Sequence, residues 1–187
     1  KGIIAMHEKL KRVSLRVLLL LRILLIIVPV ITLLSWLFPE NNLSQSILGP
    51  SIGGFIKVDQ INVFMWNNKL IGIVGSFFNL LPFVLSLVWL IKLFKNYALG
   101  DIFTVQNAKI YSRLGYVCLF SALLLQPVSQ ILFSLAVSIN YPVGQRFIAF
   151  GFGGGNLTAI IGGASLIVIA YVMRIGHEID EERNLTI

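Results

Sequence analysis

The sequence predicts an all-α polytopic membrane protein, a bundle of four transmembrane helices with a small extracytoplasmic cap that could include short β-strands. Of the 187 residues, 57% are hydrophobic and 12% are charged, with a mean hydropathy of +0.87, whereas a soluble domain carries about 25% charged residues. Four apolar stretches approach or exceed the roughly 20 residues that a helix needs to cross a bilayer. A transmembrane barrel would instead alternate apolar and polar residues in segments of about 10 residues, and these stretches do not.

Each span follows from one apolar run, and together the runs define a single domain over residues 1–187. The expected helices cover about residues 15–38, 70–94, 114–140 and 157–175. The first run could be mistaken for a signal peptide, but its apolar core is too long and no small-residue cleavage site follows it. We therefore expect a retained helix. The chain begins with Lys1, and Met6 opens an alternative native start.

The distribution of Lys and Arg predicts the orientation. Ten basic residues lie near the N-terminus, the connector at 95–113 and the tail at 176–187, and three lie in the other two loops. Because cytoplasmic flanks carry the excess of Lys and Arg, we expect both termini and the connector in the cytoplasm. Trp36 and Trp66 then belong to the outer aromatic belt. The net charge of +7 indicates anchoring to anionic lipid, and its spread over three segments disfavours direct binding of nucleic acid.

The connector is polar and carries recognisable signals for a turn and a helix start. Gly100 lets the chain turn after the second helix, and Thr104 suits an N-cap with Asn107 in the following turn. Lys109 and Arg113 are four residues apart, so they share a helix face and can meet lipid phosphates. Two interpretations stay open, namely a well-built turn and cap or a docking surface for a cytoplasmic partner.

The connector and tail also resemble a known family. The connector reads Tyr-x-x-Gly-Asp-Ile-Phe-Thr-x-x-Asn-Ala from Tyr97, followed by Arg-Leu-Gly, and the tail from Glu178 to Ile187 is acidic and contains Leu-Thr. Both are similar to segments of a bacterial membrane family known as domain of unknown function 2975. The resemblance covers the four-helix arrangement and implies no activity. Members of that family are often encoded beside a small helix-turn-helix DNA-binding protein, so the resemblance implies a bacterial inner membrane and a regulatory pairing.

Few polar groups lie within the spans. Gln126, Gln130 and Ser134 recur every four residues on the third helix, where Asn79 of the second could face them. Polar groups in lipid need partners, so this stripe indicates either hydrogen bonds between helices or a path for a small ligand. Arg22, the one charge away from the ends of the spans, either snorkels to the cytoplasmic edge or holds a lipid headgroup or anionic ligand. The lack of Asp and Glu argues against coupled ion transport.

Prolines and small residues shape the expected packing. Pro29, Pro82 and Pro127 each lie near the middle of a span, where each should free a backbone carbonyl and bend its helix. The bends could surround a cavity, although proline is also common in membrane helices generally. Small residues recur every fourth position from Gly151 to Gly163. This row predicts a close helix contact, within the bundle or with a second copy in a homo-oligomer.

The outer loops favour extended structure. Ser51–Phe64 and Gly144–Phe152 contain β-prone residues with partial alternation, so they could pair as a small sheet over the bundle. An interfacial helix is the competing interpretation for the first loop.

Catalytic signals are weak. His7 and His177 lie outside the spans, so a haem between helices is not expected. The carboxylates near His177 are better explained by a flexible acidic tail than by a metal site. The sequence has no HExxH, no serine elbow and no intramembrane Asp pair. We predict no enzyme activity, no catalytic residue, no metal and no cofactor.

The leading hypothesis is a non-enzymatic protein that binds a partner at its cytoplasmic face, in signalling or regulation. Its partner-binding residues would be Gly100, Asp101, Phe103, Thr104, Asn107, Arg113, Glu181 and Glu182. The alternative is a lipid- or small-molecule-binding subunit of a transporter or channel, which would associate with another membrane subunit. Its intramembrane residues would be Arg22, Asn79, Gln126 and Gln130.

Overall fold

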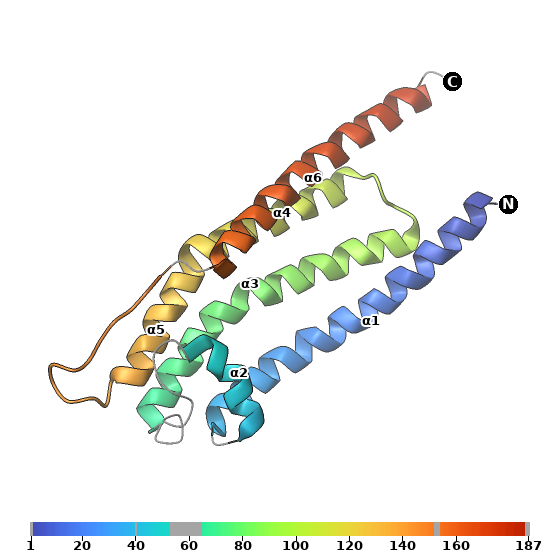
Figure 1. Ribbon diagram of the computed structural model, residues 1–187. Helices are drawn as coiled ribbons and strands as arrows, with labels where there is room; N and C mark the ends of the chain where they lie inside the picture. Colours follow the sequence, from blue (N-terminus) through green and yellow to red (C-terminus); the bar gives the residue numbers. More distant parts are fainter. Residues whose placement is uncertain (1, 40, 53–64, 152–153, 186–187) are drawn as a thin grey trace. The chain divides into compact units, whose positions relative to one another are not determined.

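The computed structural model describes residues 2–39, 41–52, 65–151 and 154–185, and these are mostly helical (Figure 1). The elements are α1 (Gly2–Leu37), α2 (Asn42–Ile52), α3 (Trp66–Leu99), α4 (Val105–Phe120), the π-helical turn η2 (Ser121–Leu125), α5 (Gln126–Ser138) and α6 (Gly154–Leu185). Among the described residues, four helical segments are long and apolar enough to cross a membrane, with α4, η2 and α5 together forming the third. The prediction of an all-α chain with four such helices is confirmed.

The two loops that were expected to pair as a small sheet differ from that expectation. The described residues contain no strand, and the segment from Gly144 to Gly151 is a turn followed by extended chain. Most of the Ser51–Phe64 stretch, namely residues 53–64, lies outside the described residues, as do residues 152 and 153. The short strands are therefore not confirmed. The first loop does contain a helix, α2, but it covers Asn42–Ile52 and so lies mostly before the Ser51–Phe64 stretch for which an interfacial helix was the competing interpretation.

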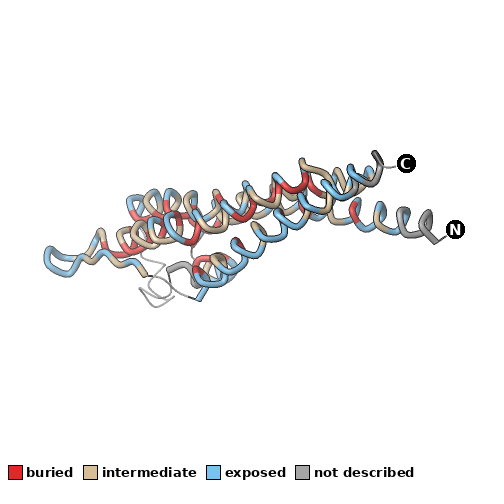
Figure 2. Tube along the Cα trace, turned by 90° about the horizontal axis from the view of Figure 1, so that it is seen from above, coloured by how far each residue is buried: buried red, intermediate tan, exposed pale blue. Residues whose placement is uncertain are grey.

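The chain divides into two compact units. Unit 1 comprises Lys1–Leu25, Phe83–Phe120 and Thr158–Ile187, and unit 2 comprises Ile26–Pro82 and Ser121–Leu157. Along the helices, buried residues alternate with exposed ones, as the red and pale blue of Figure 2 show. Large apolar side chains such as Leu19 and Val168 are exposed. Contiguous exposed apolar surface of this kind is what a helix presents to lipid.

Unit 2 has its core around Trp36. This residue was expected in an interfacial belt but is fully buried, where it stacks on Phe133 with a centroid distance of 6.1 Å. Its indole Nε1 donates a hydrogen bond to Ser76 Oγ at 2.6 Å, which satisfies the polar end of a buried indole. At Gly72, an added Cβ would lie 2.2 Å from the Trp36 ring. Glycine is therefore needed there for space.

The turn η2 contains a backbone carbonyl that loses its hydrogen-bond donor because of Pro127. In a π-helix each N–H bonds the carbonyl five residues earlier, and proline has no N–H to offer, so the carbonyl of Ala122 lacks its regular donor. Asn156 supplies one, since its Nδ2 donates to Ala122 O at 2.7 Å from a buried position. The expectation that Pro127 frees a backbone carbonyl is confirmed, with a side chain as the replacement donor.

Candidate functional site

The connector of unit 1 is short and has a defined backbone. Only residues 100–104 separate α3 from α4, because both helices extend beyond their apolar cores. Gly100 has φ +94°, which favours glycine. Its N–H donates to Tyr97 O and the Asp101 N–H donates to Asn96 O, both at 3.1 Å. These two bonds form a Schellman motif, so the end of α3 is fixed by its own carbonyls.

The start of α4 has the predicted cap. The Asn107 N–H donates to Thr104 Oγ1 at 3.2 Å, and the Ala108 N–H donates to Thr104 O at 3.1 Å. This is the standard N-cap arrangement, in which a hydroxyl accepts a bond from the third helical N–H. Thr104 therefore shapes the connector, and its hydroxyl is already engaged within the chain.

The buried side chain of Asn107 forms hydrogen bonds to the backbone of the connector. Its side chain is fully buried, and its Nδ2 donates to Asp101 O at 2.7 Å and to Ile102 O at 2.8 Å. Its Oδ1 accepts a bond from Asn96 Nδ2 at 2.7 Å. A buried amide with all these bonds fixes the loop backbone. Asn107 supports the connector surface without being exposed on it.

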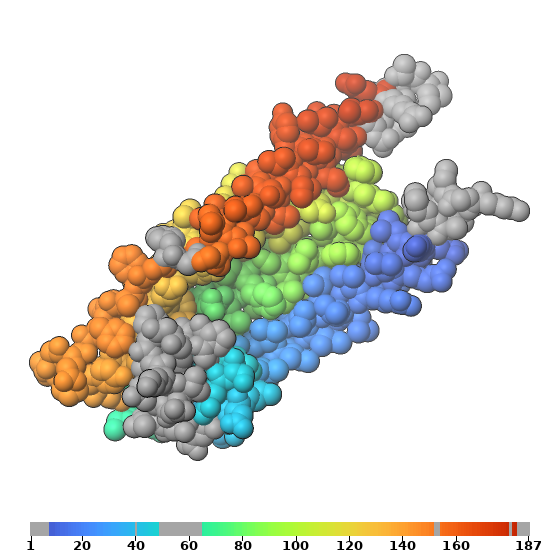
Figure 3. Space-filling view, viewed as in Figure 1, coloured from blue at the N-terminus to red at the C-terminus, as the bar shows by residue number. Residues whose placement is uncertain are grey.

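The connector meets the C-terminal part of α6. His177 Nδ1 lies 3.2 Å from Phe103 O and donates to it when that nitrogen carries the proton. A Cβ added at Gly176 would lie 3.5 Å from the Phe103 ring, so the helix backbone passes close to this side chain. In Figure 3 the lime-coloured connector lies at the surface beside the red half of α6. The tail, which was expected to be flexible, is helical as far as Leu185, where α6 ends.

We call the exposed groups of this region the docking surface. Two large apolar side chains, Leu99 and Phe103, are 71% and 57% exposed. Exposed carboxylates lie on the connector and on the C-terminal turns of α6, and the His177 ring lies 3.3 Å from one of these, Glu181. The members of the docking surface are Leu99, Asp101, Phe103, Glu178, Glu181 and Glu182.

Arg113 lies apart from these groups. Its guanidinium is 4.3 Å from the centroid of the Trp89 ring, and Lys92 Nζ is 4.4 Å from the same centroid. Both contacts are cation–π interactions. The side chain of Arg113, which belongs to α4, therefore lies against α3, and Arg113 is not a member of the docking surface.

The four candidate residues predicted to lie within the membrane are divided between the two units. Arg22 belongs to unit 1, where it is exposed beside Leu15 and Leu18. The other three belong to unit 2, where Asn79 is exposed and Gln126 is half-buried. Neither amide has a hydrogen-bond partner among the described residues. In the described part of the chain, no three His, Cys, Asp or Glu side chains could hold a metal ion.

Gln130 and two serines tie α5 to the extended segment at residues 147–151. Gln130 Oε1 accepts a bond from Gly151 N at 2.8 Å, and Ser134 Oγ accepts one from Ala149 N at 3.0 Å. Ser138 Oγ donates to Phe147 O at 2.9 Å. Four residues of helix rise about 6 Å, and two residues of extended chain span about 6.6 Å. The two periods match, so these three side chains form a ladder of bonds to a loop. The neighbouring Ser129 makes the expected bond between helices, because its Oγ donates to Gly75 O of α3 at 2.9 Å.

This ladder predicts a local effect of substitution. Replacing both Ser134 and Ser138 with alanine removes the side-chain partner of the Ala149 N–H, and each lost bond of this type costs about 1–3 kcal/mol when the group stays buried. We expect amide hydrogen exchange at Ala149 to accelerate by about tenfold or more. Ser46→Ala is the control, because Ser46 is exposed and bonds only within its own helix. Unchanged exchange in the double variant would contradict the ladder.

Buried asparagines are the structural residues that sequence reasoning missed. Asn68 is buried, and its Nδ2 donates to Ala136 O at 2.6 Å while its Oδ1 accepts bonds from Met65 N and from Asn140 Nδ2. Asn156 has a similar role at Ala122. Their one sequence signal is an amide beside a long apolar run, since such a group must find backbone partners.

The comparisons with known proteins gave one match. A family model described as "Protein of unknown function (DUF2975)" matches residues 54–187. No curated protein and no solved structure matches the chain. The match includes α3, the connector and α6, and therefore all of the docking surface.

Proposed function

The chain belongs to the DUF2975 family, and from that premise we propose that it is a non-enzymatic membrane protein that binds a soluble partner through the docking surface. The protein would be a four-helix bundle in the bacterial inner membrane, with both termini and the connector in the cytoplasm. The role we favour is regulatory, with a small soluble regulator as the partner. The observation that carries this proposal is the contact between His177 and Phe103, which joins the connector and α6 into one surface.

The composition of the docking surface supports a protein partner over a lipid one. Leu99 and Phe103 expose apolar area at a turn, beyond the most apolar part of the span. Exposed carboxylates lie on the connector and on α6, at Asp101 and Glu181. The cytoplasmic leaflet is negatively charged, so it repels acidic side chains. An apolar centre with an acidic rim instead suits a protein that presents an apolar anchor surrounded by Lys or Arg.

The rigidity of the connector supports the same proposal. The Schellman motif at Gly100, the cap at Thr104 and the buried amide of Asn107 fix the five connector residues before any partner arrives. A surface that is already ordered loses less conformational entropy on binding. The connector is therefore both a well-built turn and a suitable interface.

Phe103→Ser tests the proposal. A central aromatic anchor typically contributes about 2 kcal/mol or more to binding, so we expect the amount of co-purified partner to fall by about 30-fold after gentle extraction. Native mass spectrometry measures the amount. The matched control is Phe150→Ser, because Phe150 is similarly exposed at 66% but lies in the outer loop.

One further variant and two possible results also test whether the partner binds the docking surface. Asp101→Lys should also weaken the complex, since it reverses a rim charge while leaving the Asp101 carbonyl to accept from Asn107. A partner that stays bound to the Phe103→Ser protein would contradict the proposal. An equal loss with Phe150→Ser would contradict it as well, because the partner would then not depend on this surface.

A further inference from the structure

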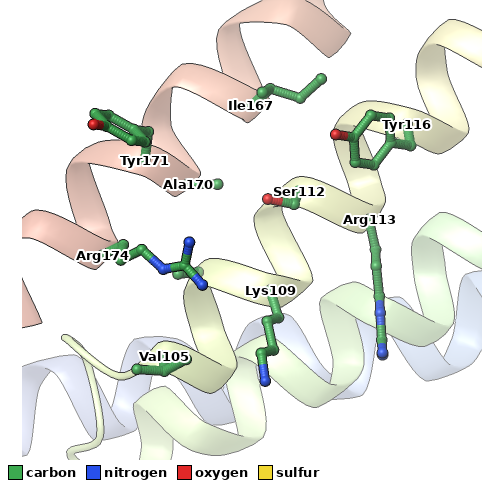
Figure 4. Close-up of a pocket in the computed structure, with 10 residues that line it drawn as sticks. Val105, Lys109, Ser112, Arg113, Tyr116, Ile167, Ala170, Tyr171 and Arg174 are labelled. Atoms are coloured by element: carbon green, nitrogen blue, oxygen red, sulfur yellow. The ribbon is translucent and has the colours of Figure 1, made fainter.

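A groove lies between α4 and α6 in unit 1, next to the docking surface but made of different residues. Its volume is about 310 Å³. The side chains that line it, drawn in Figure 4, combine cations, hydroxyl groups and apolar groups. The cations are Lys109, Arg113 and Arg174, and the hydroxyl groups belong to Ser112, Tyr116 and Tyr171.

The groove begins where α4 and α6 come into close contact at two glycines. A Cβ added at Gly115 would lie 2.6 Å from Ile167 Cγ1 and 2.7 Å from Gly163 O. Ile167 is also part of the groove lining. From there the lining runs along α4 toward Val105 and along α6 toward Arg174. It is therefore apolar at the crossing and cationic toward the connector.

The cations of the groove have no acidic partner. None of Lys109, Arg113 and Arg174 forms an ion pair with a carboxylate among the described residues. Figure 4 shows Arg174 reaching from α6 toward α4, with Ser112 on the facing side of α4. The heads of Lys109 and Arg113 point to the other side of α4, so their stems form one wall of the groove. Arg174 and Ser112 are thus the groups placed to meet a ligand first, and Lys109 can add to them by a change of rotamer.

We propose that this groove binds the phosphate of an anionic phospholipid headgroup, with Arg174 and the Ser112 hydroxyl as donors and Lys109 as a second cation. Guanidinium groups bind phosphate oxygens with paired, charge-assisted hydrogen bonds. Tyrosine suits the boundary between headgroups and acyl chains, and Tyr116 and Tyr171 are both exposed.

A lipid fits the groove better than a free phosphate does. Beyond the apolar end at Ile167, in the direction away from Arg174, the two helices carry exposed apolar side chains, including Phe120 of α4 and Ile161 of α6. Acyl chains can lie against this surface while the headgroup stays at the cationic end. A soluble phosphate would gain nothing from the apolar end. The site goes beyond the proposed partner binding, because it uses none of the docking-surface residues.

The test is native mass spectrometry of the full chain in a neutral detergent, where no charged membrane surface can attract lipid. Dioleoylphosphatidylglycerol and dioleoylphosphatidylcholine are added separately. We expect one phosphatidylglycerol per chain to be retained, with an affinity about tenfold or more above that of phosphatidylcholine. Arg174→Gln/Lys109→Gln should lower the phosphatidylglycerol affinity by about tenfold, the usual effect of losing one charge-assisted bond.

Two variants provide the controls. Lys11→Gln/Arg16→Gln removes two exposed cations of α1, which do not line the groove, and should change the affinity less than about twofold. Arg174→Lys/Lys109→Arg keeps both charges and should retain most of the binding. Equal affinity for the two lipids would overturn the proposal, as would an equal loss in the α1 variant or in the charge-preserving variant. Displacement of the lipid by millimolar inorganic phosphate would show a free-phosphate site and overturn the choice of lipid.

Discussion

Replacing Asn107 with aspartate is expected to loosen the whole connector, although the two side chains are nearly the same size. The substitution removes both Nδ2 donors and places a carboxylate oxygen against the carbonyls of Asp101 and Ile102, which are now 2.7 and 2.8 Å from Nδ2. Each buried group left without a partner costs about 1–3 kcal/mol, so we expect a loss of about 3 kcal/mol or more. Amide exchange over residues 100–104 should accelerate by about 100-fold.

The neighbouring residue gives the control. Gln106 is exposed on the same turn of α4, so Gln106→Ala should leave connector exchange unchanged. Partner binding should fall with Asn107→Asp even though Asn107 is buried, because the exposed groups would lose their fixed positions. Slow exchange over residues 100–104 in the Asn107→Asp protein would contradict the role given to this amide.

The second large effect is expected at the crossing of α4 and α6. A Cβ at Gly163 would lie 2.8 Å from Gly115 O and 3.1 Å from Cys118 Cβ, so Gly163→Ala must push two backbones apart. The clash outweighs the gain in helix propensity, which is at most about 1 kcal/mol, and overpacking of this kind costs about 1–3 kcal/mol. We expect a lower unfolding midpoint and, because the groove begins at this crossing, weaker binding of phosphatidylglycerol.

Gly162 offers a matched control one residue away on the same helix. A Cβ added there would meet nothing within 4 Å, so Gly162→Ala should be neutral or stabilising by up to about 1 kcal/mol. Gly115→Ala should resemble Gly163→Ala, and the double variant should cost less than the sum of the two, since one separation of the helices relieves both contacts. Equal changes in the unfolding midpoint for Gly162→Ala and Gly163→Ala would contradict the close contact of α4 and α6 at Gly163.

The spans and the connector could be predicted because their signals are local. A run of about 20 apolar residues predicts a membrane helix whatever surrounds it. The left-handed conformation at Gly100 and the hydroxyl cap at Thr104 likewise depend only on a few neighbouring residues. The same locality explains the error at the end of the second helix, since α3 continues to Leu99, whereas the start of α4 at Val105 agrees with the cap predicted at Thr104. Polar residues beyond the apolar core can still be helical, and hydropathy does not detect them.

The contacts of the glycines, of Gln130 and of Trp36 could not be predicted, because they depend on residues far away in the sequence. The periodicity of a helix does not specify those neighbours. The small residues from Gly151 to Gly163 were equivalent by spacing, yet a Cβ at Gly155 would meet nothing within 4 Å while one at Gly163 would meet a backbone. The stripe at Gln130 was correctly identified as polar, but its partner is the extended chain at Gly151. Trp36 fits an interfacial belt by its position, and only the packing of Phe133 against it shows a core residue.

The most direct test of the central claim is photo-crosslinking in intact cells, with a photoreactive amino acid in place of Phe103 in one protein and Phe150 in another. Both positions are exposed apolar sites, so they sample contacts with similar freedom. The account predicts that position 103 gives one discrete adduct with a soluble cytoplasmic protein and that position 150 gives none. Adducts from position 103 that contain only lipid or further copies of this chain would contradict the account, and so would the same soluble protein captured from position 150.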